Sequence, residues 1–77
     1  MHRTISGLEL VKFLSKKGFT IYGRKGSHVK MICVQRNTKT IVPQHDEIAR
    51  GTLNSILRQA KLTEEEINEL FFVTFFF

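Results

Sequence analysis

The sequence lacks several features that stabilise or export small proteins. Its 77 residues include a single cysteine, Cys33, so a framework of internal disulfides is excluded. A lone cysteine in an apolar strand is usually a small buried hydrophobe, and this usage is typical of a reducing compartment. We therefore expect a cytoplasmic protein that depends on one small hydrophobic core.

Long apolar segments are also missing. The longest run, from Leu70 to Phe77, is interrupted by Thr74, whereas a membrane-spanning helix needs about 20 apolar residues. The N-terminal MHRTISG has no apolar segment of the kind found in signal peptides. Three scattered histidines and one cysteine lack the close pairs of a zinc site. We expect no membrane association, no metal and no other cofactor.

Positive charge is concentrated in the first part of the chain. Residues 1–45 carry nine Lys or Arg and one acid, for a net charge of +8, whereas residues 46–77 carry −3. A positive surface attracts polyanions through its long-range field and through counterion release. Nucleic acid is the commonest such partner. An acidic protein would use the same field, and a charged surface also serves solubility alone.

Three helices are predicted from apolar periodicity and capping signals. Ser6 with Glu9, and Thr63 with Glu66, have the spacing of a capping box, which begins a helix. Gly18 is a usual C-terminal stop. The predicted helices span residues 7–17, residues 53–60 after a cap at Thr52, and a third segment that begins after Thr63 and buries Ile67, Leu70 and Phe71.

Three short strands are predicted between the first two helices, over residues 19–24, 28–36 and 40–42, because side chains alternate there. Such closely spaced strands should pair as an antiparallel meander, with helices on one face and the other face open. We expect a single α+β domain over residues 1–77, in the order α-β-β-β-α-α, with residues 66–77 as a C-terminal extension, helical or phenylalanine-rich. In the second strand, Val29, Met31 and Cys33 would face the helices, and His28, Lys30 and Arg36 would lie on the open face.

The turn between the first two strands has the composition of an anion-binding loop. Gly26 permits positive φ and close approach of a ligand, and consecutive N–H groups in such a turn can form a concavity for a phosphate. Neighbouring cations would add attraction for an RNA backbone. The predicted RNA-binding residues are Arg24, Lys25, Gly26, Ser27 and Lys30.

His28 directly follows this turn and is the candidate catalytic residue. The pKa of histidine ordinarily lies near neutrality, so the imidazole can take and return a proton at cellular pH. Next to a bound ribose it would remove the proton from the 2′-hydroxyl, and neighbouring cations would stabilise the charge on phosphorus. The simpler alternative is that His28 is a polar surface residue after a common Gly-Ser turn.

The stretches GFTIYGRKGSHVKM and IVPQHDEIARGTLNSILRQAKLT resemble the HicA family of bacterial and archaeal toxins. The resemblance covers about residues 6–63, and the Lys25-to-His28 run and the Gly51-Thr52 pair are among its most specific parts. It implies a fold like that of a double-stranded-RNA-binding domain, mRNA interferase activity, and neutralisation by a HicB antitoxin. It also implies that His28 is the catalytic residue, with mRNA as the substrate.

Other residues keep alternatives open. His45 is a candidate for the acid that protonates the leaving oxygen, or is simply a loop residue after Pro43. Tyr22 is a candidate for stacking on a base, although covering apolar surface is the commoner role. The phenylalanine-rich tail matches no feature of the family, and we expect it to pack against the helices. The alternative function is a non-catalytic RNA-binding module, and a third is a protein-binding domain with a basic face.

Overall fold

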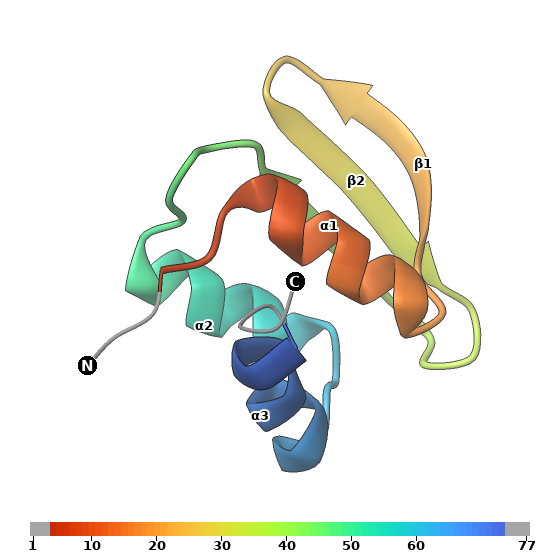
Figure 1. Cartoon of the computed structure of the whole chain (residues 1–77). Helices are drawn as coiled ribbons and strands as arrows, with labels where there is room; N and C mark the ends of the chain where they lie inside the picture. Colours follow the sequence, from red (N-terminus) through yellow and green to blue (C-terminus); the bar gives the residue numbers. More distant parts are fainter. Residues whose placement is uncertain (1–3, 74–77) are drawn as a thin grey trace.

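The computed structural model describes residues 4–73 and has the predicted order of elements (Figure 1). It forms one open three-stranded antiparallel sheet with three helices, so the predicted α+β class and element order are confirmed. The elements are α1 (Gly7–Lys16), β1 (Thr20–Lys25), β2 (His28–Cys33), β3 (Thr38–Pro43), α2 (Arg50–Gln59) and α3 (Glu64–Val73).

The start of α1 is fixed by the predicted capping box. The Glu9 amide donates to Ser6 Oγ at 3.0 Å, and the Ser6 amide donates to the Glu9 carboxylate at 3.0 Å. These two bonds satisfy amides that would otherwise lack partners in the first turn. Gly18 has φ of +96° and lies just beyond the end of α1, where a glycine was expected to stop the helix.

Gly7 allows α1 to pack directly on the backbone that follows β3. A Cβ atom at this position would lie 2.2 Å from the Pro43 carbonyl oxygen and 2.7 Å from Gln44 Cα. The Gly7 amide donates to the His45 carbonyl at 2.9 Å. Only glycine permits this approach, and it holds the end of β3 against the helix layer.

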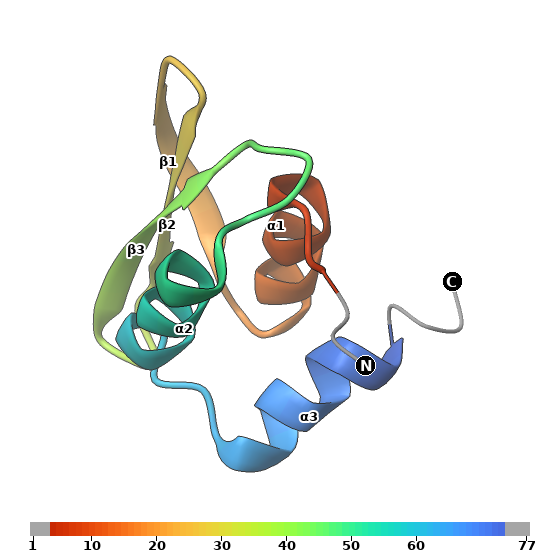
Figure 2. The same ribbon diagram turned by 90° about the vertical axis from the view of Figure 1, so that its left-hand side faces the viewer.

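The sheet has the order β1-β2-β3, and α1 and α2 cover one of its faces (Figure 2). Val29, Met31 and Cys33 are buried beneath the helices, and the residues between them lie on the other face, because side chains alternate along a strand. The predicted alternation in β2 is confirmed. This face without helices is called the open face below.

A β-bulge between Ile21 and Gly23 changes the alternation in β1. Gly23 lies opposite Lys30, and Arg24 lies opposite Val29, so Arg24 leaves the sheet on the helix side. Strict alternation over the predicted strand 19–24 would put Arg24 on the same face as Tyr22, and the bulge makes that expectation wrong. The extra residue of the bulge shifts every later side chain by one position.

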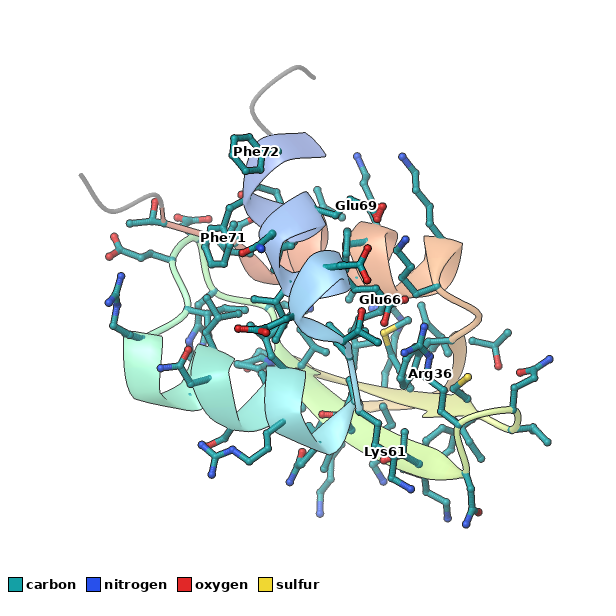
Figure 3. The ribbon with its side chains drawn as sticks, turned by 90° about the horizontal axis from the view of Figure 1, so that it is seen from below. Arg36, Lys61, Glu66, Glu69, Phe71 and Phe72 are labelled. Carbon is teal, nitrogen blue, oxygen red and sulfur yellow. The ribbon has the colours of Figure 1, made fainter. Side chains whose placement is uncertain are left out.

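The second strand ends at Cys33, three residues earlier than predicted, and Arg36 does not lie on the open face. Arg36 is in the turn between β2 and β3, and its guanidinium donates to both oxygens of Glu66, at 2.8 and 2.5 Å. It also donates to the Lys61 carbonyl at 3.1 Å. This long-range ion pair explains why Arg36 is directed toward α3 (Figure 3).

The second helix begins at Arg50, and Thr52 is within its first turn instead of capping it. The preceding segment, residues 44–49, has no regular secondary structure, but Ile48 is buried and its amide donates to the Ile5 carbonyl at 2.9 Å. The segment is thereby anchored before Arg50. Ala49 is the N-cap and makes no side-chain hydrogen bond.

The third helix begins with the predicted capping box, in which the Glu66 amide donates to Thr63 Oγ1 at 3.1 Å and the Thr63 amide donates to Glu66 at 3.0 Å. Leu70 is fully buried, and Ile67 and Phe71 are partly buried against the same core. Phe72, by contrast, is 67% exposed. The expected packing of the tail is therefore confirmed only in part, and residues 74–77 lie outside the described region.

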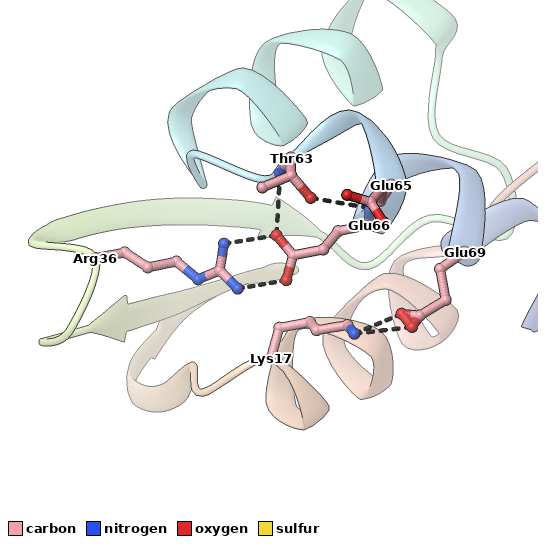
Figure 4. A pocket seen from close by; sticks show the side chains of 6 residues that line it. All are labelled: Lys17, Arg36, Thr63, Glu65, Glu66 and Glu69. Atoms are coloured by element: carbon pink, nitrogen blue, oxygen red, sulfur yellow. Dashed lines mark hydrogen bonds and ion pairs between the residues drawn. The ribbon is translucent and has the colours of Figure 1, made fainter.

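Two ion pairs attach α3 to the rest of the fold (Figure 4). Besides the pair of Arg36 with Glu66, Lys17 binds both carboxylate oxygens of Glu69, at 2.5 and 2.9 Å. The Arg36 and Glu66 side chains are only 22% and 18% exposed. Hydrogen bonding from Arg36 lowers the pKa of Glu66 from 4.5 to about 2, and the same contact raises the pKa of Arg36.

The lowered pKa of Glu66 predicts a pH-dependent contribution to stability. A carboxylate with a lower pKa in the folded state stabilises the fold above its unfolded pKa and loses this effect as the pH falls through the folded pKa. Glu66→Gln should therefore unfold at lower urea concentration than the wild type at pH 7, and the difference should shrink between pH 4.5 and about 2. Urea titrations at several pH values measure it. A difference that is constant across this range would contradict the charge-based explanation.

No helix within residues 4–73 is long and apolar enough to cross a membrane.

Candidate nucleic-acid interface

The turn between β1 and β2 is a two-residue hairpin turn made by Gly26 and Ser27. Lys25 and His28 pair across it, and Gly26 has φ of +59° whereas Ser27 does not have positive φ. Positive φ at the first central position alone is the pattern of a type II′ turn, where glycine is preferred. A Cβ at Gly26 would meet nothing within 4 Å, so the turn is open to an incoming ligand.

The base of this turn is bonded to the chain after β3. The Gln44 amide donates to the Ser27 carbonyl at 2.7 Å. Gln44 directly follows Pro43, which lies opposite His28 in the sheet. Because α1 also packs on this segment through Gly7, the hairpin end is held in place although its side chains are exposed.

His28 is exposed at the first position of β2. Its neighbours across the sheet are Lys25 on one side and Pro43 on the other. Residues directly opposite share a face, so the imidazole lies on the open face between a cation and a proline that carries no charge. The residue is accessible to solvent and to a polymer lying across the sheet.

The structure brings three of the predicted basic or ionisable residues together on the open face. Lys25 and His28 form one cross-strand pair, and Lys30 is two residues further along β2. Lys30 lies opposite Gly23 and Ile41 and is partly buried. Gly26 and Ser27 form the adjoining exposed turn. Arg24, which the bulge directs to the helix side, is the one predicted RNA-binding residue that is not part of this group.

Two further residues lie together on the open face: Lys39, which was not predicted to take part, and Tyr22, for which stacking on a base was the less common alternative. Lys39 lies opposite Ile32 in β3, and its Nζ is 5.7 Å from the centre of the Tyr22 ring. Tyr22 is on β1, so the two side chains meet across the central strand. The alternation of β3 gave a signal for Lys39, because Thr40 and Val42 are buried and the residues that alternate with them, Lys39 and Ile41, point outward.

His45 is exposed in the segment that follows β3. Its backbone carbonyl accepts from Gly7, which fixes the main chain there and leaves the side chain available. Its role as an acid or as a plain loop residue stays a prediction.

A separate hollow lies between α1, α3 and the turn after β2, and it is lined by charged side chains (Figure 4). Its cations, Lys17 and Arg36, are paired with Glu69 and Glu66. Paired cations offer little attraction to a polyanion, so this hollow is not the candidate interface. No group of three or more His, Cys, Asp or Glu side chains in residues 4–73 is arranged to hold a metal ion.

The fold and the open face define a small basic α+β domain whose helices cover only one side of the sheet. The family model of the HicA toxin of bacterial toxin–antitoxin systems matches residues 7–62. Because the match covers most of the chain, the protein belongs to the HicA toxin family. It is therefore the toxin component of a toxin–antitoxin system, with an antitoxin as partner. A comparison with curated proteins finds no match. The helix α3 lies beyond the matched segment.

Proposed function

We propose that this toxin is a metal-independent endoribonuclease that cuts mRNA and arrests translation. The observation that carries the proposal is an exposed imidazole, His28, on a basic open face directly beside a glycine turn. Membership of a toxin family supports a damaging activity. The proposed site combines an exposed proton carrier with cations, which are the two functions that RNA transesterification needs.

The proposed reaction uses the ribose as its own nucleophile. His28 removes the proton from a 2′-hydroxyl, and the 2′-oxygen attacks the adjacent phosphorus. The bond to the 5′-oxygen of the next nucleotide breaks, and that oxygen takes a proton from an acid, for which His45 is the candidate. The products are a 2′,3′-cyclic phosphate and a 5′-hydroxyl. No external electron acceptor or donor is involved.

The surrounding residues would position the phosphate. The backbone amides of the Gly26-Ser27 turn can approach the phosphate oxygens closely, and Lys25 and Lys30 flank His28 on the same face. Their charges favour the extra negative charge that develops on phosphorus in the transition state. Arg24 would contribute only to the general positive field, because it leaves the sheet on the other side.

The proposed protein partner is a HicB-type antitoxin. An antitoxin that covers the open face would block access to His28, and the positive charge of this face suits an acidic surface. Under this proposal, RNA cleavage by the toxin should be suppressed when the antitoxin is bound. A complex that cuts RNA as fast as the free toxin would refute occlusion without affecting the proposed chemistry.

The proposed function is tested with purified protein and end-labelled single-stranded RNA in EDTA. We expect fragments that end in a cyclic phosphate. A matched RNA with 2′-deoxyribose at the cut position should stay intact there, because it lacks the nucleophile. Binding without fragments would instead identify a non-catalytic RNA-binding module, and cleavage that requires a divalent ion would contradict the metal-independent mechanism.

A further inference from the structure

Tyr22 is unusually accessible for an aromatic residue in a short strand. Its side chain is 49% exposed, and it is the extra residue at the bulge of β1. Lys39 lies 5.7 Å from its ring centre, and Ile41 on the same face is 48% exposed. The open face therefore presents an aromatic ring, a cation and an apolar side chain to solvent, beyond the residues assigned to cleavage.

The sheet register places this group next to His28. Successive cross-strand rows on the open face are Lys25, His28 and Pro43, then Gly23, Lys30 and Ile41, then Thr20, Ile32 and Lys39. Adjacent rows on one face are separated by two residues, or roughly 7 Å. Tyr22 directly precedes Gly23 of the second row, and Lys39 of the third row lies over its ring, so Tyr22 is one to two rows from His28. This separation, roughly 7–14 Å along the sheet, corresponds to about one or two nucleotides of an extended strand.

A hollow of about 400 Å³ lies beside Tyr22, between β3 and α2. Lys39 and Ile41 line it from the strand, and Thr52 and Ser55 line it from the helix. The ring offers a stacking surface for a base, the ammonium suits a phosphate, and the hydroxyls can bond to ribose or to base edges.

Charge and the exposed ring together favour a nucleic acid over a protein as the occupant. No Asp or Glu occurs between residues 10 and 45, so the whole sheet and both of its turns lack carboxylates. An apolar partner protein would have to leave Lys30 and Lys39 without counter-charges, and an acidic one would match the charges without supplying a base for the Tyr22 ring. A single RNA strand supplies a phosphate at every step and a base for the ring.

We propose that Tyr22, Lys39 and Ile41 form a nucleobase subsite, which stacks an unpaired base of single-stranded RNA on the Tyr22 ring about one or two nucleotides from the bond that His28 cuts. The position of the cut relative to the subsite rests on the proposed function. The binding of a base rests only on the residues of the open face. Stacking needs an unstacked base, so the subsite selects single strands over duplex RNA.

The chain contains one tyrosine and no tryptophan, so its intrinsic fluorescence reports on Tyr22 alone. The experiment uses the His28→Ala protein, in which the proposed function predicts slow cleavage of bound RNA, and a short oligouridylate. A matched oligomer in which abasic nucleotides replace the uridines keeps the phosphates and removes the bases. We expect the uridylate to quench the tyrosine fluorescence and the abasic oligomer to leave it largely unchanged.

Affinity is measured in parallel by anisotropy of labelled RNA. In the same background, Tyr22→Ala should weaken uridylate binding by about 5- to 150-fold, the range expected for one stacked base. Tyr22→Phe keeps the ring and should bind like the parent. Equal affinities for Tyr22→Ala and its parent, or equal quenching by both oligomers, would overturn the subsite. Quenching by the antitoxin with none by RNA would also overturn it and would identify a protein contact.

The two proposals fail in different ways. Cleavage that depends on His28, together with no base-dependent quenching, removes the subsite and leaves the nuclease. Base-dependent quenching by a protein that never cuts RNA removes the nuclease and leaves the subsite.

Discussion

Replacing His28 by alanine should lower the rate of RNA cleavage by about 10²–10⁴-fold, which is the usual contribution of a general acid–base residue. The fold should not change, because the side chain is exposed and β2 is held by the backbone pairs of this residue with Lys25 and Pro43. The rate is measured under single-turnover conditions with protein in excess, so that weaker binding cannot be mistaken for slower chemistry. Circular dichroism and urea unfolding verify the fold.

Two further variants separate chemistry from charge. Lys30→Ala removes a cation from the open face and should weaken RNA binding, with an effect that decreases at high salt. Lys12→Ala removes the same charge from the exposed side of α1 and is the matched control. If His28 acts as the proton carrier, His28→Ala should retain RNA affinity and lose only the rate. A His28→Ala protein that cuts at the wild-type rate and still arrests growth would end the proposed mechanism.

The same assay decides the role of His45. If its imidazole protonates the leaving oxygen, His45→Ala should also slow cleavage. If it is only a loop residue, the rate should match that of the wild type, because its structural contact is made by the backbone carbonyl. Either result leaves the role of His28 as base intact.

Local sequence patterns predict those parts of the fold that depend on residues close together in the chain. Both capping boxes join residues three positions apart, so Ser6 with Glu9 and Thr63 with Glu66 could be recognised from spacing alone. The alternation in β2 was also predictable, because one face of the strand is buried and a shift of one residue would expose Val29 and Met31.

The errors arise where a side chain is placed by the pairing or packing of separate segments. Arg24 changes face because of a bulge in β1. The bulge depends on how β1 pairs with β2, and no residue pattern in the sequence marks its position. Arg36 leaves the open face because Glu66, 30 residues further along, provides a shielded partner. Apolar periodicity gives no information about such a pair.

The candidate site was predicted where it is continuous in the sequence. The run from Lys25 to Lys30 forms one hairpin, so its residues are neighbours in both sequence and structure. Tyr22 and Lys39 meet only because three strands lie side by side. Recognising their contact requires the register of both strand pairs, which a single sequence does not supply.

The second large effect concerns α3, which lies outside the segment matched by the family model. Leu70→Ala should lower the free energy of unfolding by about 2–5 kcal/mol, the usual cost of replacing a fully buried leucine by alanine. A domain of this size has a total stability of about 5–15 kcal/mol, so a large share would be lost. The reason is that Leu70 is fully buried in the same core as Leu10 and Leu57.

Phe72→Ala is the matched control, since it removes a larger apolar side chain from the same helix at a position that is 67% exposed. Its free energy of unfolding should stay within about 0.5 kcal/mol of the wild type. Urea titration at neutral pH compares all three proteins. Equal stabilities for Leu70→Ala and the wild type would mean that α3 is an appendage. If Leu70→Ala lowers the free energy of unfolding and Phe72→Ala does not, this toxin needs α3 to complete its core. The reason is that the cavity left at Leu70 opens between α3 and the family-matched segment.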